Sequence, residues 1–187
     1  MITAESVRPF TIRPIGTLHT PFATIADCPR NGRQPQPAPL CRASIWPEFS
    51  AGLASLEGFS HLILLYWLDR SPGPGLTVNP AFDGTLRGVF ATRSPRRPNP
   101  IGLSVVAFEG FADAVTLRVR YLDCVDGTPL IDIKPYLPTT DAEPDANMGW
   151  LAPHATIASK LSNVPKPPSQ VLDELPGDTA RARTAGD

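Results

Sequence analysis

Residues 61–68, His-Leu-Ile-Leu-Leu-Tyr-Trp-Leu, contain the longest apolar run in the chain. An uninterrupted run of this length predicts a strand that is either buried on both faces or closed into a barrel. It is far shorter than the roughly 18–20 apolar residues that a membrane-spanning helix needs. The fold is therefore expected to be built around this strand, without a membrane span.

Proline is unusually frequent on both sides of this run. The chain has 23 prolines among 187 residues, about 12%, against a typical ~5%. Each proline removes a backbone donor and fixes φ, which suits loops, strand ends and sheet edges. A helical bundle and a doubly wound α/β fold are both disfavoured, so the chain is predicted to be mainly β.

The remaining elements follow from alternation and turn residues. We expect a small β-barrel or strongly curved sheet with one or two short helices and no Rossmann domain. Residues 1–164 would form one domain, and the Pro-, Ala- and charge-rich residues 165–187 a flexible tail. Strands are predicted at 10–18, 43–46, 61–68, 88–91, 103–108, 114–122 and 129–136, and helices at 48–59 and 154–162.

Several classes of protein are excluded by what the sequence lacks. The three cysteines are widely spaced and include no C-x-x-C pair, which disfavours a disulfide framework or a zinc site and favours a reducing cytoplasm. The N-terminus has no basic segment followed by an apolar one, so no secretory signal is predicted. There is no G-x-S-x-G, P-loop or G-x-G-x-x-G motif.

A basic, proline-rich loop is the sharpest local feature. Residues 93–102 read Arg-Ser-Pro-Arg-Arg-Pro-Asn-Pro-Ile-Gly, and no acidic residue occurs between Asp83 and Glu109. Prolines hold the arginines at low entropy cost, and guanidinium groups so presented suit carboxylate or phosphate recognition. The alternative is a connection with solvated arginines, and the composition leaves the two open.

A second candidate segment runs from residue 122 to residue 138. It places three carboxylates around one turn, and Lys134 and Tyr136 alternate with Asp132 on one strand face. The simpler interpretation is a turn followed by an Asp132–Lys134 ion pair. The acid spacing lacks the pattern of a calcium loop, so no metal site is predicted. His61 is interpreted as structural, and Cys28, although next to Pro29-Arg30, has no paired base and is rejected as a nucleophile.

Four motifs together add a resemblance to a known family. Over roughly residues 12–150 the chain looks like the TrmO (YaeB-like) family of tRNA methyltransferases. The motifs that carry the resemblance are, in chain order, IGTLHTPF, LEGFSHLILLYWL, RSPRRPNPIGLS and DGTPLIDIKPYLP. The resemblance implies a small cytoplasmic β-barrel enzyme that uses S-adenosylmethionine and works as a homodimer, without a metal and away from membranes. Its implied substrate is tRNA, methylated at N6 of threonylcarbamoyladenosine at position 37, beside the anticodon.

The resemblance also implies site residues. The family's cofactor loop corresponds to Pro29, Arg30 and Asn31, and this chain departs from the family pattern at Asn31, where the family has glutamine. Further cofactor contacts are expected at Asp69, Arg70, Arg93, Leu103, Tyr121, Leu122 and Asp123. Arg96, Arg97 and Asn99 match positions assigned to RNA binding, and Asp126, Lys134 and Tyr136 to the catalytic surface.

Two alternatives remain beside this interpretation. Because residues 165–187 are expected to be a flexible tail, we expect no counterpart of the C-terminal domain of longer family members, which bears on RNA docking and substrate identity. One alternative is a methyltransferase for another RNA or a small molecule. The other is a non-catalytic module that binds nucleotides or RNA through the arginine loop.

Overall fold

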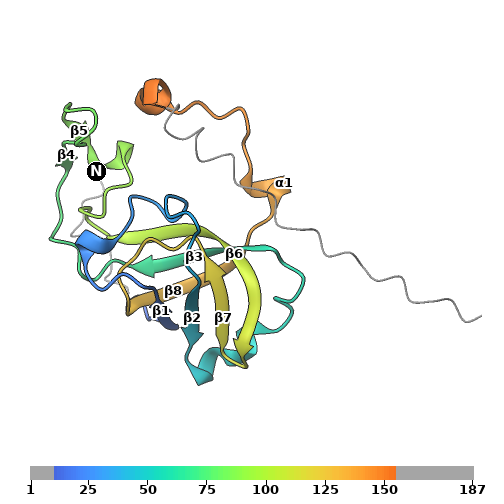
Figure 1. Ribbon diagram of the computed structural model, residues 1–187. Coiled ribbons are helices and arrows are strands. Elements are labelled where there is room, and N and C mark those ends of the chain that lie inside the picture. The colour runs from blue at the N-terminus through green and yellow to red at the C-terminus, as the bar shows by residue number, and fades with distance from the viewer. Residues whose placement is uncertain (1–10, 155–187) are drawn as a thin grey trace, which may run out of the picture. The chain divides into compact units, whose positions relative to one another are not determined.

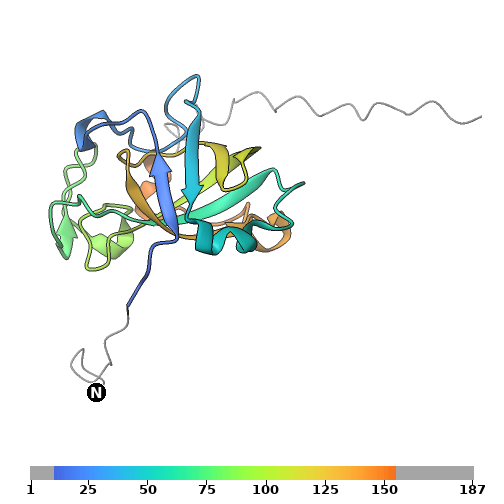
Figure 2. The same ribbon diagram turned by 90° about the horizontal axis from the view of Figure 1, so that it is seen from below.

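Six strands form a closed barrel in the computed structural model, which describes residues 11–154. Every neighbouring pair of barrel strands is antiparallel, and the order around the barrel is β1-β2-β7-β6-β3-β8 (Figure 1). Figure 2 shows the closure, where β1 lies between β2 and β8. The prediction of a mainly β barrel is confirmed. The strands are β1 (Gly16–His19), β2 (Cys41–Ile45), β3 (His61–Trp67), β6 (Ile101–Asp113), β7 (Thr116–Arg120) and β8 (Thr128–Pro135).

The central apolar run forms β3 with strictly alternating burial. Leu62 and Leu64 are 0% exposed and Tyr66 is 3% exposed, while the residues between them face outward and are partly exposed. The strand is therefore buried on one face only, as expected for a barrel wall rather than for a sheet covered on both faces. Its inward residues join a core that also includes Leu18, Ala43, Val106, Leu117, Val119, Leu122 and Leu130.

Two local predictions were wrong. The helix expected at 48–59 is only the short 3₁₀ helix η3 (Pro47–Leu53), and Ser55, with φ of 67°, breaks any continuation. The strand expected at 88–91 is instead a 3₁₀ turn, η4 (Val89–Ala91), preceded by β5 (Arg87–Gly88). β5 pairs with β4 (Thr77–Val78), a strand that was not predicted. In Figure 1 the β4–β5 pair stands apart from the barrel strands.

Few helical residues complete the described part of the chain. These are η2 (Ile25–Asp27) in the long loop after β1, α1 (Pro138–Asp141) after β8, and η5 (Gly149–His154), which belongs to a second unit beginning at Asn147. Over residues 11–154, no helix has the length and apolar character to cross a membrane. Most of the helix predicted at 154–162, and the whole tail predicted at 165–187, lie outside the described residues.

Candidate active site

A pocket of about 820 Å³ opens near the end of β3, within the size range of pockets that enclose small organic ligands. Its walls come from four parts of the chain that are distant in sequence. They are the loop at residues 28–31, the segment from the end of β3 to residue 72, the arginine-rich residues 93–99, and residues 123–128. Leu65, Ile101 and Leu103, on the outer faces of β3 and β6, form what we call the pocket floor.

A buried polar network lies beside the floor. Tyr66 Oη donates to Asp123 Oδ1 over 2.8 Å, and Ser104 Oγ lies 2.9 Å from Tyr66 Oη and 3.4 Å from the same carboxylate oxygen. The Tyr66 ring occupies the space beside Gly102, where an added Cβ would lie 2.0 Å from ring atom Cε2. Glycine at this position therefore allows the phenol to reach Asp123.

Burial dominates the electrostatics of Asp123. Desolvation raises the pKa of this carboxyl, while the hydrogen bonds from Tyr66 and Ser104 and the positive charge of Arg93 act in the opposite direction. A partly desolvated carboxylate near a guanidinium, in a pocket, is an arrangement typical of functional sites.

The loop at 28–31 is held in place by close packing at its next residue, Gly32. An added Cβ on Gly32 would lie 1.9 Å from the Tyr121 carbonyl oxygen, so only glycine fits against this backbone. Tyr121 has a φ of 78°, which non-glycine residues seldom adopt, and the Arg33 guanidinium lies 4.4 Å from its ring centroid. The loop and the end of β7 therefore form one tightly packed junction.

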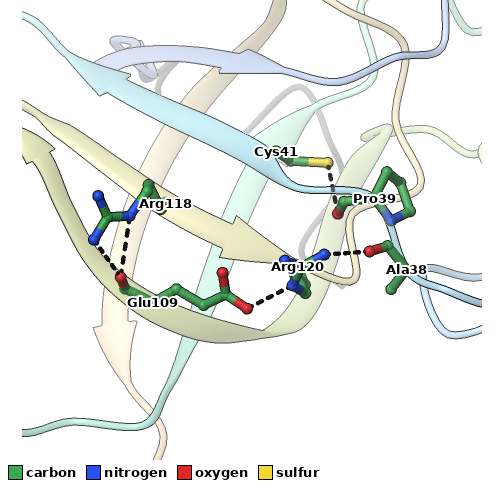
Figure 3. Close-up of polar contacts among 6 residues, drawn as sticks. All are labelled: Ala38, Pro39, Cys41, Glu109, Arg118 and Arg120. Atoms are coloured by element: carbon green, nitrogen blue, oxygen red, sulfur yellow. Dashed lines mark hydrogen bonds and ion pairs between the residues drawn. The ribbon is translucent and has the colours of Figure 1, made fainter.

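Arg120 fixes the far end of the same loop, as Figure 3 shows. Its guanidinium donates to the Ala38 carbonyl and to the Glu109 carboxylate, so it connects the loop to both β7 and β6. The neighbouring Arg118 donates to the Glu109 carbonyl. These arginines support the loop from the barrel wall.

The arginine loop predicted from the sequence borders the pocket. Arg93 and Arg97 both line it. Arg97 Nη1 also donates to the Thr92 carbonyl over 3.2 Å and lies 3.4 Å from that of Ser94, so this guanidinium braces its own loop. The loop presents cations to an enclosed space rather than only to bulk solvent.

The structure brings most of the expected cofactor residues to the pocket. Tyr121 does not line it, and Leu122 is 1% exposed in the core. Among the expected RNA-binding residues, Arg97 and Asn99 line the pocket and Arg96 does not. The cofactor residues that line it are Pro29, Arg30, Asn31, Asp69, Arg70, Arg93, Leu103 and Asp123.

None of the three expected catalytic residues lines the pocket. Asp126 lies at the turn before β8, where its carboxylate accepts from the Thr20 backbone N–H over 3.1 Å and lies 3.6 Å from His19 Nδ1. Lys134 forms the expected ion pair with Asp132, at 2.7 Å. The Tyr136 ring meets His61 edge-on, with centroids 6.3 Å apart.

Strand register nevertheless connects Lys134 and Tyr136 to the pocket. Going backward along β3 from Leu65 of the pocket floor, the next two residues on the outer face are Ile63 and His61. Ile63 is paired with Lys134 on β8, and the His61 carbonyl accepts a hydrogen bond from the Tyr136 N–H. Successive outward residues of a strand are about 6.6–6.8 Å apart. Lys134 is therefore one step, and Tyr136 two steps, along the same sheet face from the pocket floor.

Sequence reasoning missed several residues of this site. Tyr66, Ser104 and Gly102 carry its buried network, and the signal for Tyr66 was a polar hydroxyl within an apolar run, which needs a buried partner. Burial and nearby acids raise the pKa of Cys28, although Arg30 is close to it in sequence. Burial also raises the pKa of Cys124, to about 12. Within residues 11–154, no cluster of acidic, histidine or cysteine side chains is suited to hold a metal ion.

Fold and site together define a β-barrel protein with an arginine-rich pocket suited to an organic ligand, formed by loops at the end of β3. Residues 17–142 match the tRNA-methyltransferase O N-terminal domain, and the chain belongs to this TrmO family.

Named relatives agree with this assignment. A probable S-adenosyl-L-methionine-binding protein of Archaeoglobus fulgidus is 42% identical over 153 residues, covering 82% of this chain and 41% of the relative. The tRNA (adenine(37)-N6)-methyltransferase of Escherichia coli is 38% identical over 166 residues, covering 80% and 68% respectively. The crystal structure of TrmO from Pseudomonas aeruginosa matches with a TM-score of 0.63 at 37% identity, over 76% of this chain and 62% of that one. The chain thus spans less than half of the Archaeoglobus relative and under two thirds of the Pseudomonas structure.

Proposed function

We propose that this protein is an S-adenosylmethionine-dependent tRNA methyltransferase that methylates N6 of the modified adenosine beside the anticodon. The observation that carries the proposal is the arginine-rich pocket in a chain of the TrmO family, whose Escherichia coli relative is named as a methyltransferase of this kind. The Archaeoglobus relative, named for binding S-adenosyl-L-methionine, supports the choice of cofactor.

The residues of the pocket fit this cofactor. S-adenosylmethionine carries a carboxylate, an ammonium group, a ribose diol and a flat base, and it supplies a methyl group on a positively charged sulfur. Arg93 suits the carboxylate, and Asp123 is a buried acceptor suited to a cationic or hydroxyl group. The apolar floor residue Leu103 suits an uncharged part of the ligand.

Positioning is the main task of the remaining residues. Transfer to N6 would form a carbon–nitrogen bond as the carbon–sulfur bond breaks, with S-adenosylhomocysteine as the leaving group and the N6 proton released to water. Alignment of the two reactants can supply much of the rate. We place the adenine over the sheet face next to the pocket floor, where Lys134 and Tyr136 hold it and Asp126, whose side chain is 52% exposed, remains the third candidate for the catalytic surface.

Phosphate contacts would come from the loop that borders the pocket. Arg96 is exposed, and no acidic residue lies within twelve positions on either side of it. Arg97 and Asn99 flank the pocket mouth on the same loop. Cationic side chains of this kind position RNA by its backbone.

We further propose a cytoplasmic homodimer. Support for the dimer comes from exposed apolar side chains on the β4–β5 arm and η4, namely Leu76 at 70%, Leu86 at 67% and Phe90 at 76% exposure. Phe90 also lines the pocket, so a second copy covering this arm would lie next to the site.

The test is mass spectrometry of tRNA from a strain lacking the gene, together with purified protein, cofactor and unmodified tRNA in vitro. Loss of the N6-methyl mark in the strain and its appearance in vitro are the expected results. Binding of S-adenosylmethionine without methylation of tRNA would favour another substrate, either an RNA or a small molecule. No binding of the cofactor would favour a non-catalytic module.

A further inference from the structure

Arg33 follows the pocket residues Arg30 and Asn31 in the loop, and its guanidinium lies over the ring of Tyr121. Its guanidinium is 4.4 Å from the ring centroid, and the Tyr121 backbone is fixed by its packing against Gly32. Arg33 itself is exposed. One guanidinium face is thus covered by an aromatic ring that cannot readily move, and the group is preorganised for contact on its outer side.

The sheet beside Arg33 offers a shallow apolar place. Across the barrel wall, His61 pairs with Ala107, and Ala107 pairs with Arg120, the residue before Tyr121. Neighbouring strands are roughly 4.8 Å apart, so the His61 and Arg120 backbones are about 10 Å apart with only the alanine methyl between them. The Tyr136 ring borders this place by its edge-on contact with His61.

Two ion pairs, Arg120 with Glu109 and Lys134 with Asp132, lie around this place. Arg120 is already engaged by Glu109 and the Ala38 carbonyl, which leaves Arg33 as the exposed guanidinium at the junction. The pKa of His61 is lowered, first by burial and then by the charge of Arg33, which favours the neutral form of the ring. Lys134 lies one step along the same face and is paired with Asp132.

We propose that Arg33, Tyr121, His61 and Ala107 form a stacking platform for one unpaired nucleotide of the RNA, adjacent in sequence to the nucleotide that is methylated, with Tyr136 at the border between the two nucleotides. The base stacks on the outer face of the Arg33 guanidinium above Ala107, and its phosphate lies toward Lys134. The proposal rests on the proposed function, because it places this nucleotide beyond the target base, near His61. His61 is two outward residues of β3 away from Leu65 of the pocket floor.

The chemistry favours a single-stranded nucleotide over other occupants. Bases that are splayed out of a helix are commonly stacked on aromatic rings and on arginine planes, and such stacking tolerates any base. An acidic peptide would be drawn to the same cations but would gain nothing from a flat guanidinium over a ring. A platform of this kind selects for an open loop and against duplex RNA.

The test is a cycle of two changes, Arg33→Lys in the protein and an abasic site in an anticodon stem-loop RNA. Arg33→Lys keeps the charge but removes the planar group, so RNA affinity should fall about 5-fold or more while its salt dependence stays unchanged. An abasic site on the correct side of the target adenosine should cost wild type a similar factor and cost the variant almost nothing. Each neighbour of the target is made abasic in turn.

Arg42→Lys is the matched control, since Arg42 is also exposed but lies on β2. Its RNA affinity should equal that of wild type, and cofactor affinity should be unchanged in both variants. Equal abasic penalties in wild type and Arg33→Lys would overturn the platform. Absence of methylation by wild type would overturn the proposed function instead, and the binding cycle would still decide whether Arg33 stacks on RNA.

Discussion

Tyr66 donates a 2.8 Å hydrogen bond to Asp123, a residue 57 positions later in the chain. Tyr66 belongs to the barrel wall, at 3% exposure, whereas Asp123 belongs to the segment that lines the pocket. The bond therefore connects the rigid core to the carboxylate that we propose for cofactor binding.

Tyr66→Phe should destabilise the protein in a pH-dependent way. The phenol favours the ionised form of Asp123 and opposes the rise in pKa that burial causes, so its removal raises the pKa further. The charge-dependent contribution is present while Asp123 is ionised and is lost as the pH falls through the pKa of the folded state. Urea unfolding should show a loss of about 1.5–3 kcal/mol at pH 7.5 and a smaller loss at pH 4. Tyr136→Phe, at the outer face, is the control; equal losses at both pH values would contradict the role given to the phenol.

Arg93→Ala should weaken binding of S-adenosylmethionine about tenfold or more. A charge-assisted contact is worth roughly 1.5–3 kcal/mol, and Arg93 lines the pocket near Asp123. Calorimetry measures the change, with Arg42→Ala as a variant of equal charge away from the site. Unchanged affinity in folded Arg93→Ala would remove this residue from the cofactor site.

Arg96→Ala and Arg97→Ala should differ, although the sequence suggested one shared role in RNA binding. Arg96→Ala should leave cofactor affinity intact and reduce the log–log salt slope of tRNA binding by roughly 0.7–0.9, the value of one phosphate contact. Arg97→Ala should also weaken cofactor binding, because Arg97 braces the loop through the Thr92 carbonyl. Identical behaviour of the two variants in both assays would refute this division.

Gly32→Ala should cost about 1–3 kcal/mol of stability and weaken cofactor binding. An added methyl group would collide with the Tyr121 backbone at 1.9 Å and push the loop off the end of β7. Gly52→Ala is the matched control, since nothing lies within 4 Å of its added Cβ, and it should be neutral or stabilising by up to about 1 kcal/mol. Equal melting temperatures for the two variants would argue against the packing described here.

Leu86→Asp should shift the protein from dimer to monomer. Leu86 is 67% exposed on the β4–β5 arm, and a carboxylate there would be desolvated in an interface. Light scattering at low micromolar concentration should give about twice 20.1 kDa for wild type and about 20.1 kDa for the variant. Leu40→Asp, at 49% exposure on the loop, should remain dimeric. A wild-type mass near that of one chain would contradict the proposed dimer.

The strands that were predicted well are those in which local pattern and burial agree. β3 and β8 lie within a residue or two of their predicted bounds, because an apolar run of strand length marks β3 and a turn directly precedes β8. The turn at Asp126-Gly127 also follows local chemistry, with φ of 82° at the glycine. The prediction of a strand at 88–91 was wrong because three apolar residues suit a short strand and a 3₁₀ turn equally well. The pairing of β5 with β4 ends at Gly88, and Val89–Ala91 form the turn.

The site could be predicted only in part, for a related reason. The arginine loop is a local feature and was visible from its residues. The contact of Gly32 with Tyr121 and the approach of Tyr66 to Asp123 are set by the register between segments far apart in the chain, which no local pattern reports. Family resemblance supplied the expected cofactor residues, and their roles, like those of Arg96, Arg97 and Lys134, stay predictions.

The outward-facing residues of β3 form a row with a fixed spacing, which sets distances along the outer face of the barrel. Leu65, Ile63 and His61 stand at a spacing set by the backbone pleat and by pairing with β6 and β8, not by the loops. On the proposed function, the distance between the methyl donor and its acceptor is then set by the barrel wall. Loops could be exchanged to alter which RNA is captured while that distance stays the same, whereas a one-residue slip of β3 would turn this row into the core.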